Sequence, residues 1–332
     1  MVDKTSVITF IAMGTVNTIT LFNQVSDEVK VAVFQLVNEL ENKFTVNRAQ
    51  SEVMSINDAA GKKPVAVSDD VFELIQRAVA AGLLPDSGFN PAIGNLTKLW
   101  KKCLTDRILP SPAQISSAMK AISPRNIKLN AEQKTVFLTQ ADMSIDLGAI
   151  AKGYIADQIA TLLAEYHIYS GIIDLGGNIV VIGNSPKNPQ GIWKVGIQKP
   201  FAKRGLYAGI VSVRNKSVVT SGNYEKYTEI NGKQYHHIID PRTGYPFEGP
   251  LDSVTIISDN SIEGEILSTL LYFHGLKQGL KLIQNAPHFF TSSYLGAVFI
   301  SKDKKIYLSQ NLINKFKLVC SDYELGENHR FC

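Results

Sequence analysis

The order of strand and helix signals along the chain constrains its fold more than any other feature of the sequence. Apolar residues at helical spacing predict helices over 26–44 and 68–81 in the first half and over 261–274 in the second. The rest of the second half mostly alternates polar and apolar residues, and Asn231-Gly232 is a strong hairpin signal. Helices and hairpins in this order predict an α+β fold with mostly antiparallel or mixed sheets and packed helices.

Shorter segments complete this pattern. Further helices are expected around 96–103 and 111–121, and another opens in 144–157 and ends near residue 166. The other predicted strands flank Met13-Gly14-Thr15 and lie within 126–138, 171–181, 193–198, 206–213, 217–220, 226–230, 234–239, 253–258 and 297–308. No G-x-G-x-x-G segment opens a helix after a strand and no Walker A sequence is present, so the fold is expected to be neither Rossmann nor P-loop.

The composition indicates a globular protein and argues against binding to nucleic acid and against a membrane span. Hydrophobic residues make up 45% of the 332 residues, which is enough for a substantial core. The net charge of +4 is small and dispersed, so nucleic acid is not expected as a partner. No window has the apolar length of a membrane span, and the N-terminus lacks the pattern of a signal peptide. Cys103, Cys320 and Cys332 form no disulfide framework or metal-ligand spacing, so we expect a cytoplasmic protein.

The segment 144–157, SIDLGAIAKGYIAD, combines the features of a helix start with small residues and one lysine. Asp146 stands where it would cap the helix, and Gly148 and Ala149 leave the first turn uncovered. The N–H groups and the positive end of a helix favour an anion, and Lys152 would add a positive charge. The alternative is a capped helix whose small residues allow close packing and whose lysine extends to solvent.

Two further segments contain residues suited to a substrate site. The glycines of DLGGN (174–178) allow positive φ and close approach of the backbone, although an ordinary bend between strands would also use them. In YHHIIDPRTGYP (235–246), strand alternation places His236 and His237 on opposite faces, so at most one of them enters a given pocket. A histidine beside the rigid turn that follows can act as a general base, or it can bond to the backbone of the turn.

The helix over 261–274 carries a candidate pair of metal ligands. Asn260 and Glu263 match a capping box at its start. Glu265 and Thr269 lie four residues apart on one face, and a carboxylate with a hydroxyl is an oxygen pair suited to Mg²⁺. An exposed Glu–Thr pair without a ligand is the alternative.

The loop over 86–94, DSGFNPAIG, is rich in turn residues and has one aromatic side chain. The ring of Phe89 can stack on a flat ligand. A plain connection between two helices would look the same.

Taken together and in this order, these segments resemble the ApbE family of flavin transferases. The resemblance extends from Met13-Gly14-Thr15 to Gly275, and its most specific parts are IDLGAIAKGYIAD, DLGGN, TSGNYEKY with YHHIIDPRTGYP, and EILST. The early segment 47–57, NRAQSEVMSIN, matches the S-E-x-x-x-x-N segment of the family. The resemblance implies one ApbE-like domain over residues 1–332, and two lobes with the FAD site between them are the alternative arrangement.

Members of this family split FAD and transfer FMN through its phosphate to a threonine or serine hydroxyl of an acceptor flavoprotein, with release of AMP. The resemblance therefore implies FAD as substrate, Mg²⁺ as cofactor and an acceptor flavoprotein as partner. By position it assigns contacts with FAD to Met13, Asn47, Gly88, Phe89, Asn90, Asp146 and Lys152. It assigns metal binding to the Ala149 carbonyl, Glu265 and Thr269. Asn47 stands where some members carry an aromatic residue, and Glu265 where the family usually has aspartate.

The mechanism that the resemblance implies gives each group one task. Mg²⁺ on its three ligands bridges the pyrophosphate oxygens, and Lys152 adds a second positive charge. His237, which matches the H-I-I-D-P segment of the family, takes the proton from the acceptor hydroxyl, and this hydroxyl attacks the FMN phosphorus. His236 is expected to be dispensable.

Three other functions stay open on the sequence alone. If water replaces the acceptor hydroxyl, the same site makes an FAD pyrophosphatase that yields FMN and AMP. If the change at Glu265 reflects a lost metal site, the chain binds FAD without turnover. A structural interaction domain, in which the glycines serve only turns, would require every match to be accidental.

Overall fold

The computed structural model describes residues 5–285 and 290–327, and its contacts divide the chain into two compact units. Unit 1 comprises Met1–Glu39, Lys152–Gly222 and Pro250–Cys332, and unit 2 comprises Leu40–Ala151 and Asn223–Gly249. The chain passes from one unit to the other four times, first within α1 (Asp27–Phe44). Cys332 lies outside the described residues.

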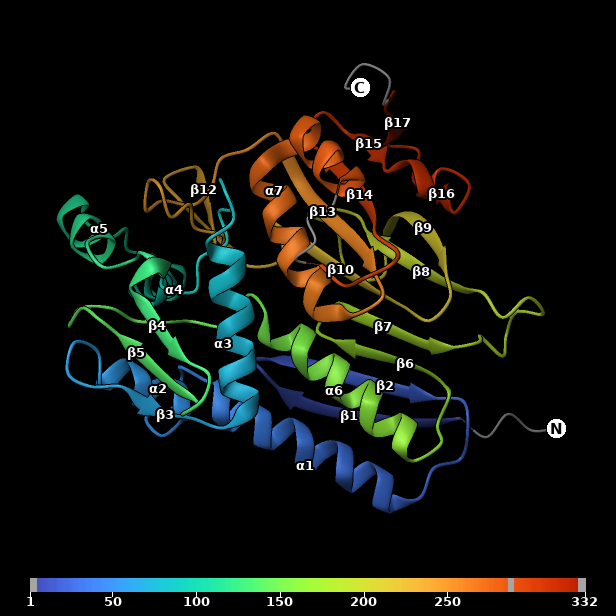
Figure 1. The fold of residues 1–332 in the computed structure, drawn as a ribbon. Coiled ribbons are helices and arrows are strands. Elements are labelled where there is room, and N and C mark those ends of the chain that lie inside the picture. Colours follow the sequence, from blue (N-terminus) through green and yellow to red (C-terminus); the bar gives the residue numbers. More distant parts are fainter. Residues whose placement is uncertain (1–4, 286–289, 328–332) are drawn as a thin grey trace. The chain divides into compact units, whose positions relative to one another are not determined.

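A nine-stranded sheet forms the centre of unit 1 (Figure 1). Its strands, in spatial order, are β1 (Ser6–Ala12), β2 (Thr15–Leu21), β6 (Ser170–Leu175), β7 (Asn178–Gly183), β10 (Lys216–Gly222), β13 (Leu251–Ser258), β14 (Gly296–Ser301), β15 (Lys305–Leu308) and β17 (Glu324–Leu325). Neighbouring strands pair antiparallel except β15 and β17, which pair parallel. The predicted α+β class with a mixed, mostly antiparallel sheet is confirmed.

Both faces of the sheet are covered near its middle by other parts of unit 1. A three-stranded sheet of β16 (Phe316–Leu318), β9 (Tyr207–Val213) and β8 (Trp193–Gln198) shares a core with one face, in which Trp193 and Ile257 take part. Helix α7 (Ser261–Gln284) lies across β10 and β13 on the other face, where Gly264 meets Val219 (Figure 1). Because β13 is covered on both sides, nearly all of its residues are buried. Neither α7 nor any other helix within the described residues has the length and apolar composition needed to cross a membrane.

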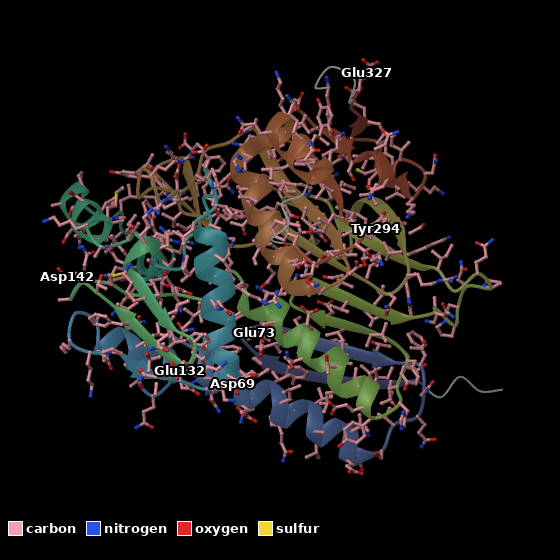
Figure 2. All side chains as sticks on the ribbon, viewed as in Figure 1. Asp69, Glu73, Glu132, Asp142, Tyr294 and Glu327 are labelled. Carbon is pink, nitrogen blue, oxygen red and sulfur yellow. The ribbon has the colours of Figure 1, made fainter. Side chains whose placement is uncertain are left out.

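Unit 2 combines short helices with two small sheets. Its helices are α2 (Glu52–Asp58), α3 (Asp69–Gly82), α4 (Gly94–Asp106), α5 (Pro112–Met119) and the 3₁₀ turn Pro124–Asn126. Its strands form one sheet of β3 (Val65–Ala66), β5 (Thr135–Leu138) and β4 (Ile127–Asn130), and one hairpin of β11 (Tyr227–Ile230) and β12 (Lys233–His236). Asp69 and Glu132, labelled in Figure 2, mark the start of α3 and the turn between β4 and β5. Lys134 in this turn pairs with Asp69 at 3.2 Å.

Most predicted elements are present, whereas three segments differ from the prediction. The segment 297–308 is divided between β14 and β15 by the turn at 302–304. The segment 171–181 is not one strand but parts of β6 and β7, which join at Gly176-Gly177 with φ of 64° and 98°. Apolar residues continue on both sides and suggest one strand, but the positive φ of the two glycines agrees with the bend between strands that DLGGN allows. The helix expected to open near Asp146 begins only at Ala151 and ends at Glu165 as α6, because the residues before it are held by contacts with other segments.

The start of α7 holds a distant loop and does not form the predicted capping box. Asn260 accepts a hydrogen bond from the backbone of Glu263, as predicted. The carboxylate of Glu263, however, accepts from Thr291 N at 2.6 Å, Thr291 Oγ1 at 2.8 Å and Ser292 N at 2.9 Å. Burial opposes ionisation of this carboxyl, but the hydrogen bonds from Ser292 and Thr291 outweigh it and lower the pKa of Glu263.

The neighbouring Asp259 holds the same loop. It accepts hydrogen bonds from Ser293 N at 2.6 Å and Tyr294 N at 3.1 Å, and it pairs with Lys216 at 2.7 Å. The ring of Tyr294, labelled in Figure 2, lies between the ammonium groups of Lys216 and Lys315, at 5.4 and 4.4 Å from its centroid. Two acidic residues at the start of α7 thus fix residues 291–294 on unit 1.

Glu263→Gln is expected to lower the free energy of unfolding at pH 7 by about 1–2 kcal/mol, because a glutamine leaves a partly buried donor of the loop without its acceptor. The folded-state pKa of Glu263 is lowered, so its stabilisation is present above the unfolded pKa of about 4.3 and is lost as the pH falls through the folded value. The difference between wild type and variant in urea unfolding should therefore shrink below about pH 4.

Glu165→Gln is the matched control, since Glu165 is the exposed last residue of α6. This variant should change the free energy of unfolding by less than about 0.5 kcal/mol. A loss at Glu263→Gln that stays constant from pH 7 to pH 3 would contradict the role given to the ionised carboxylate.

Candidate functional site

In unit 1 the predicted site residues Lys152 and Glu265 meet where α6 and α7 begin. Lys152 Nζ lies 3.2 Å from Glu265 Oε1, and the backbone N–H of Gly153 donates to Glu265 Oε2 at 2.9 Å. The side chain of Glu265 is 5% exposed and that of Lys152 is 29% exposed. This approach requires glycine at 153, because a Cβ there would lie 2.7 Å from Ser261 O and 2.8 Å from Ile262 Cα.

Two residues without a predicted role fix Glu265 and the start of α7. Asn178, the last residue of DLGGN, donates to Glu265 Oε1 at 3.1 Å and accepts from Ser261 Oγ at 2.6 Å. Asp157 of α6 accepts from the backbone N–H groups of Ser261 at 2.7 Å and Ile262 at 2.9 Å, so it caps α7 from outside the helix. Both residues end motifs quoted from the sequence, but their partners are far away along the chain.

Thr269 lies one helical turn beyond Glu265 and faces the end of β10. Its Oγ1 is 3.3 Å from Ser221 Oγ, which is also 2.8 Å from Ser268 Oγ. The Glu265 carboxylate and the Thr269 hydroxyl are oxygen ligands of the kind that Mg²⁺ prefers. The Lys152 ammonium shows that the surroundings of this carboxylate accept a positive charge. Within residues 5–285 and 290–327, no group of three or more His, Cys, Asp or Glu side chains is placed to hold a metal ion. The donor set therefore fits a divalent cation held by one carboxylate together with hydroxyl, carbonyl and water oxygens.

Met13 lies in a turn of unit 1 that neighbours the turn of DLGGN. Met13 and Gly14 have φ of 54° and 69°, the values of a two-residue hairpin turn between β1 and β2. Asn17 closes this turn, since its side chain donates to the carbonyls of Ala12 and Thr15 at 3.0 and 3.2 Å. Strand β2 pairs with β6, which brings the two turns to the same end of the sheet.

In unit 2, Asp146 closes a turn ahead of α6. Its Oδ1 accepts from Gly148 N at 2.8 Å, and its Oδ2 accepts from Thr97 Oγ1 of α4 at 2.8 Å. Its own N–H donates to Pro91 O at 2.9 Å. Asp146 is therefore not the N-cap of α6, and the prediction of that cap is wrong. Gly148 and Ala149, which follow in the turn, are exposed as expected.

Asn57 fixes the residue before Asp146. Its side chain accepts from Ile145 N at 2.8 Å and donates to Ile145 O at 3.1 Å. It ends the S-E-x-x-x-x-N segment, in which Glu52 accepts from Ser68 N at 2.6 Å at the start of α3. The segment matched to the family thus serves as an anchor, which the sequence pattern alone does not reveal.

The other FAD-contact candidates of unit 2 are held mainly by their own unit. Phe89 is 4% exposed, so its ring packs inside the unit and does not extend into solvent. Gly88 has φ of 62°, and the side chain of Asn90 bonds at both ends to backbone groups at 2.8 Å. Asn47 is exposed and accepts a hydrogen bond from Lys101.

The two neighbouring histidines have different surroundings, as strand alternation predicts. His236 is buried, its Nε2 donates to Phe247 O at 3.0 Å, and its Nδ1 accepts from Ile238 N at 3.3 Å. These contacts hold His236 as a neutral imidazole. His237 is exposed, and its Nδ1 lies 3.2 Å from Lys226 O. A carbonyl only accepts, so this bond places a proton on Nδ1 and the lone pair of the neutral ring on Nε2.

Trp100 of α4 anchors the segment that follows His237. Its Nε1 donates to Gly244 O at 2.7 Å, and its ring stacks on Tyr235 with centroids 5.8 Å apart. Within the same turn, Asp240 accepts two side-chain hydrogen bonds from Arg242 at 2.8 and 2.9 Å, and this raises the pKa of the guanidinium. Trp100 had no predicted role, because a lone tryptophan in a predicted helix was its only signal in the sequence.

Comparison with known proteins finds a family model, similar sequences and similar structures that match this chain. The model of the ApbE family matches residues 13–290. A Klebsiella pneumoniae (strain 342) protein named FAD:protein FMN transferase is 42% identical over 293 residues and 88% of each chain. A Treponema pallidum (strain Nichols) protein of the same name is 34% identical over 88% of this chain and 82% of its own. The crystal structure of the ApbE protein from Thermotoga maritima MSB8 matches with a TM-score of 0.81 at 27% identity, covering 92% of this chain and 97% of that one. The flavin transferase ApbE from Vibrio cholerae shares the fold, with a TM-score of 0.78 at 22% identity over 92% and 97%.

Gly153→Ala is expected to lower the free energy of unfolding of unit 1 by about 1–3 kcal/mol, because the added methyl meets the backbone of α7. The same displacement should weaken the contact between Lys152 and Glu265. Urea unfolding measures the loss, with Thr161→Ala on the exposed side of α6 as the control, at less than about 0.5 kcal/mol. Full stability in Gly153→Ala would mean that the two helices do not pack as closely as the structure has them.

Proposed function

The chain belongs to the ApbE family, and we propose that it transfers FMN from FAD to a threonine or serine hydroxyl of an acceptor flavoprotein, with release of AMP. The observation that carries this proposal is the ion pair of the buried Glu265 with the partly buried Lys152, one helical turn before Thr269 on α7. A pyrophosphate substrate carries several negative charges, and a lysine next to oxygen ligands for a cation is suited to such a substrate. As a transferase, the protein would bind FAD as substrate and an acceptor protein as partner.

We propose that Glu265, Thr269 and the carbonyl of Ala149 hold Mg²⁺. When bound, the ion would supply positive charge to the pyrophosphate oxygens. Lys152 would add charge beside them, since its ammonium lies next to Glu265. Contacts with the rest of FAD are proposed for Met13, Asn47, Gly88, Phe89, Asn90 and Asp146.

His237 is the proposed general base. Its exposed ring and its Nδ1 contact with Lys226 O support this role, because the lone pair then resides on Nε2. In the proposed step, Nε2 takes the proton of the acceptor hydroxyl while the hydroxyl oxygen bonds to the FMN phosphorus. The bond from this phosphorus to the AMP phosphate oxygen breaks, and AMP leaves with that electron pair.

We also propose that the protein is cytoplasmic and that its acceptor is intracellular. Cys103 and Cys320 are both free thiols, which is typical of proteins in a reducing compartment.

Incubation of the protein with FAD, Mg²⁺ and a candidate acceptor flavoprotein should add the mass of one FMN to a threonine or serine of the acceptor. One AMP should appear for each FMN transferred, and excess chelator should stop both, because Mg²⁺ is needed for charge neutralisation. Mass spectrometry and chromatography of AMP are the measurements. Equal AMP release without acceptor would identify a pyrophosphatase instead, and tight FAD binding without AMP would identify a binding protein.

His237→Ala should reduce FMN transfer by about 10²- to 10⁴-fold, the usual contribution of a general base. His236→Ala should retain transfer in its folded fraction but lose about 1–2 kcal/mol of stability, because a buried carbonyl and a backbone N–H lose their partner. Steady-state transfer rates and urea unfolding of both variants check this pair. Equal loss of transfer in the two variants, or none at His237→Ala, would reject the assignment.

A further inference from the structure

Lys152 is the cation paired with Glu265 in the part of the chain that the structure describes. The other two donors to this carboxylate, Gly153 N and Asn178 Nδ2, are neutral. Glu265 is 5% exposed, and burial of a charge without a partner of opposite sign is costly. Lys152 therefore neutralises Glu265 in the cation-free protein.

We propose that Lys152 is an exchangeable counter-ion of Glu265. When a divalent cation binds at that carboxylate, the Lys152 ammonium moves away from it and pairs with the anionic substrate instead. This inference rests on the proposed function and deepens it, because it couples the cation to the substrate through one side chain. Lys152 then has two positions, one on the carboxylate and one on the substrate phosphates.

The donors to Glu265 differ in how firmly they are held. Asn178 is 3% exposed and fixed by Ser261 Oγ at 2.6 Å, and Gly153 N belongs to a helix backbone. Lys152 instead ends a flexible stem, and its side chain is 29% exposed. Asn178 and Gly153 can therefore keep the carboxylate in place while the ammonium moves away.

Repulsion between like charges explains why the two cations compete. Oε1 lies 3.2 Å from the Lys152 ammonium and accepts a hydrogen bond from Asn178 at 3.1 Å. A divalent cation on Oε1 would take the place beside the ammonium, and a cation on Oε2 would stand close to it, so in either position it repels Lys152. Thr269 carries the next oxygen on the same face of α7. Departure of Lys152 therefore removes the repulsion between the ammonium and the divalent cation, and the cation keeps both of its ligands on α7.

Binding of Mn²⁺ to the full chain without flavin tests the exchange. Free Mn²⁺ is counted by its electron paramagnetic resonance signal. Lys152→Met should bind Mn²⁺ about tenfold more tightly than wild type, because the competing ammonium is gone, and Lys152→Arg should stay close to wild type. Lys216→Met is the matched control, since Lys216 is also a partly buried partner of an acidic side chain in unit 1 and should leave the Mn²⁺ affinity unchanged.

An equal gain in Lys216→Met would reveal a general charge effect and overturn the proposal, as would a Lys152→Met affinity no higher than that of wild type. Glu265→Gln and Thr269→Val identify the site, because both should remove the tight Mn²⁺ binding of Lys152→Met. If they leave it unchanged, the cation does not bind at Glu265 and the metal part of the proposed function fails as well. FMN transfer by wild type tests the reaction separately, so a failed exchange and a failed function give different results.

A measurement that keeps Lys152 covers the case in which Lys152→Met does not fold. Lysines of the wild type are reductively dimethylated with ¹³C-formaldehyde and a borohydride, which retains their charge, and the Lys152 signal is identified by its loss in Lys152→Arg. Addition of Mg²⁺ should shift the ¹³C signal of Lys152 and not that of Lys216. An unshifted Lys152 signal at saturating Mg²⁺ would overturn the proposal.

Discussion

The candidate site of unit 1 exists because α6 and α7 begin against one another. Asp157 accepts two N–H groups at the start of α7, and a carboxylate at this position is stabilised by the helix dipole by about 0.3–1 kcal/mol. Glycine at 153 allows the two backbones to touch, since any Cβ would meet Ser261. Only then does α6 bring Lys152 to Glu265, which α7 carries. The ion pair is thus a consequence of a backbone contact between two helices.

The buried polar groups at this contact define positions more than they add stability. A buried ion pair contributes little net stability because desolvation offsets the attraction, whereas removal of one partner costs about 3–5 kcal/mol. Hydrogen bonds join Gly153 and Asn178 to Glu265 and Ser261 to Asn178, and this network favours one arrangement over its alternatives. Unit 2 uses hydrogen bonds in the same way, because the Asn57 side chain bonds to both the N–H and the carbonyl of Ile145, the residue before Asp146. Side chains held this way are suited to a substrate that must be oriented.

Local sequence patterns were sufficient for most of the fold, because neighbours in sequence determine helices and tight turns. The apolar stripe of α3 and the turn at Asn231-Gly232 led to the observed elements. The bend at Gly176-Gly177 was indicated by its two glycines, whereas the run of apolar residues on both sides suggested one continuous strand. The resemblance to the family identified Lys152 and Glu265 as site residues one by one. No sequence pattern near either residue predicts that the two side chains are in contact. Trp100 and other anchors were missed for the same reason, since their partners lie far away in the sequence.

The packing of α6 against α7 explains why residue 265 is a glutamate and not an aspartate. The resemblance to the family implies aspartate there, and a side chain shorter by one methylene would withdraw the carboxylate by about 1.5 Å. The bonds from Gly153 N and Asn178, at 2.9 and 3.1 Å, would then lengthen beyond hydrogen-bond distance. The helices cannot close this gap, because Gly153 already has no side chain to give up and lies against Ser261. At the observed separation of α6 and α7, glutamate is the acidic side chain long enough to reach both donors and Lys152.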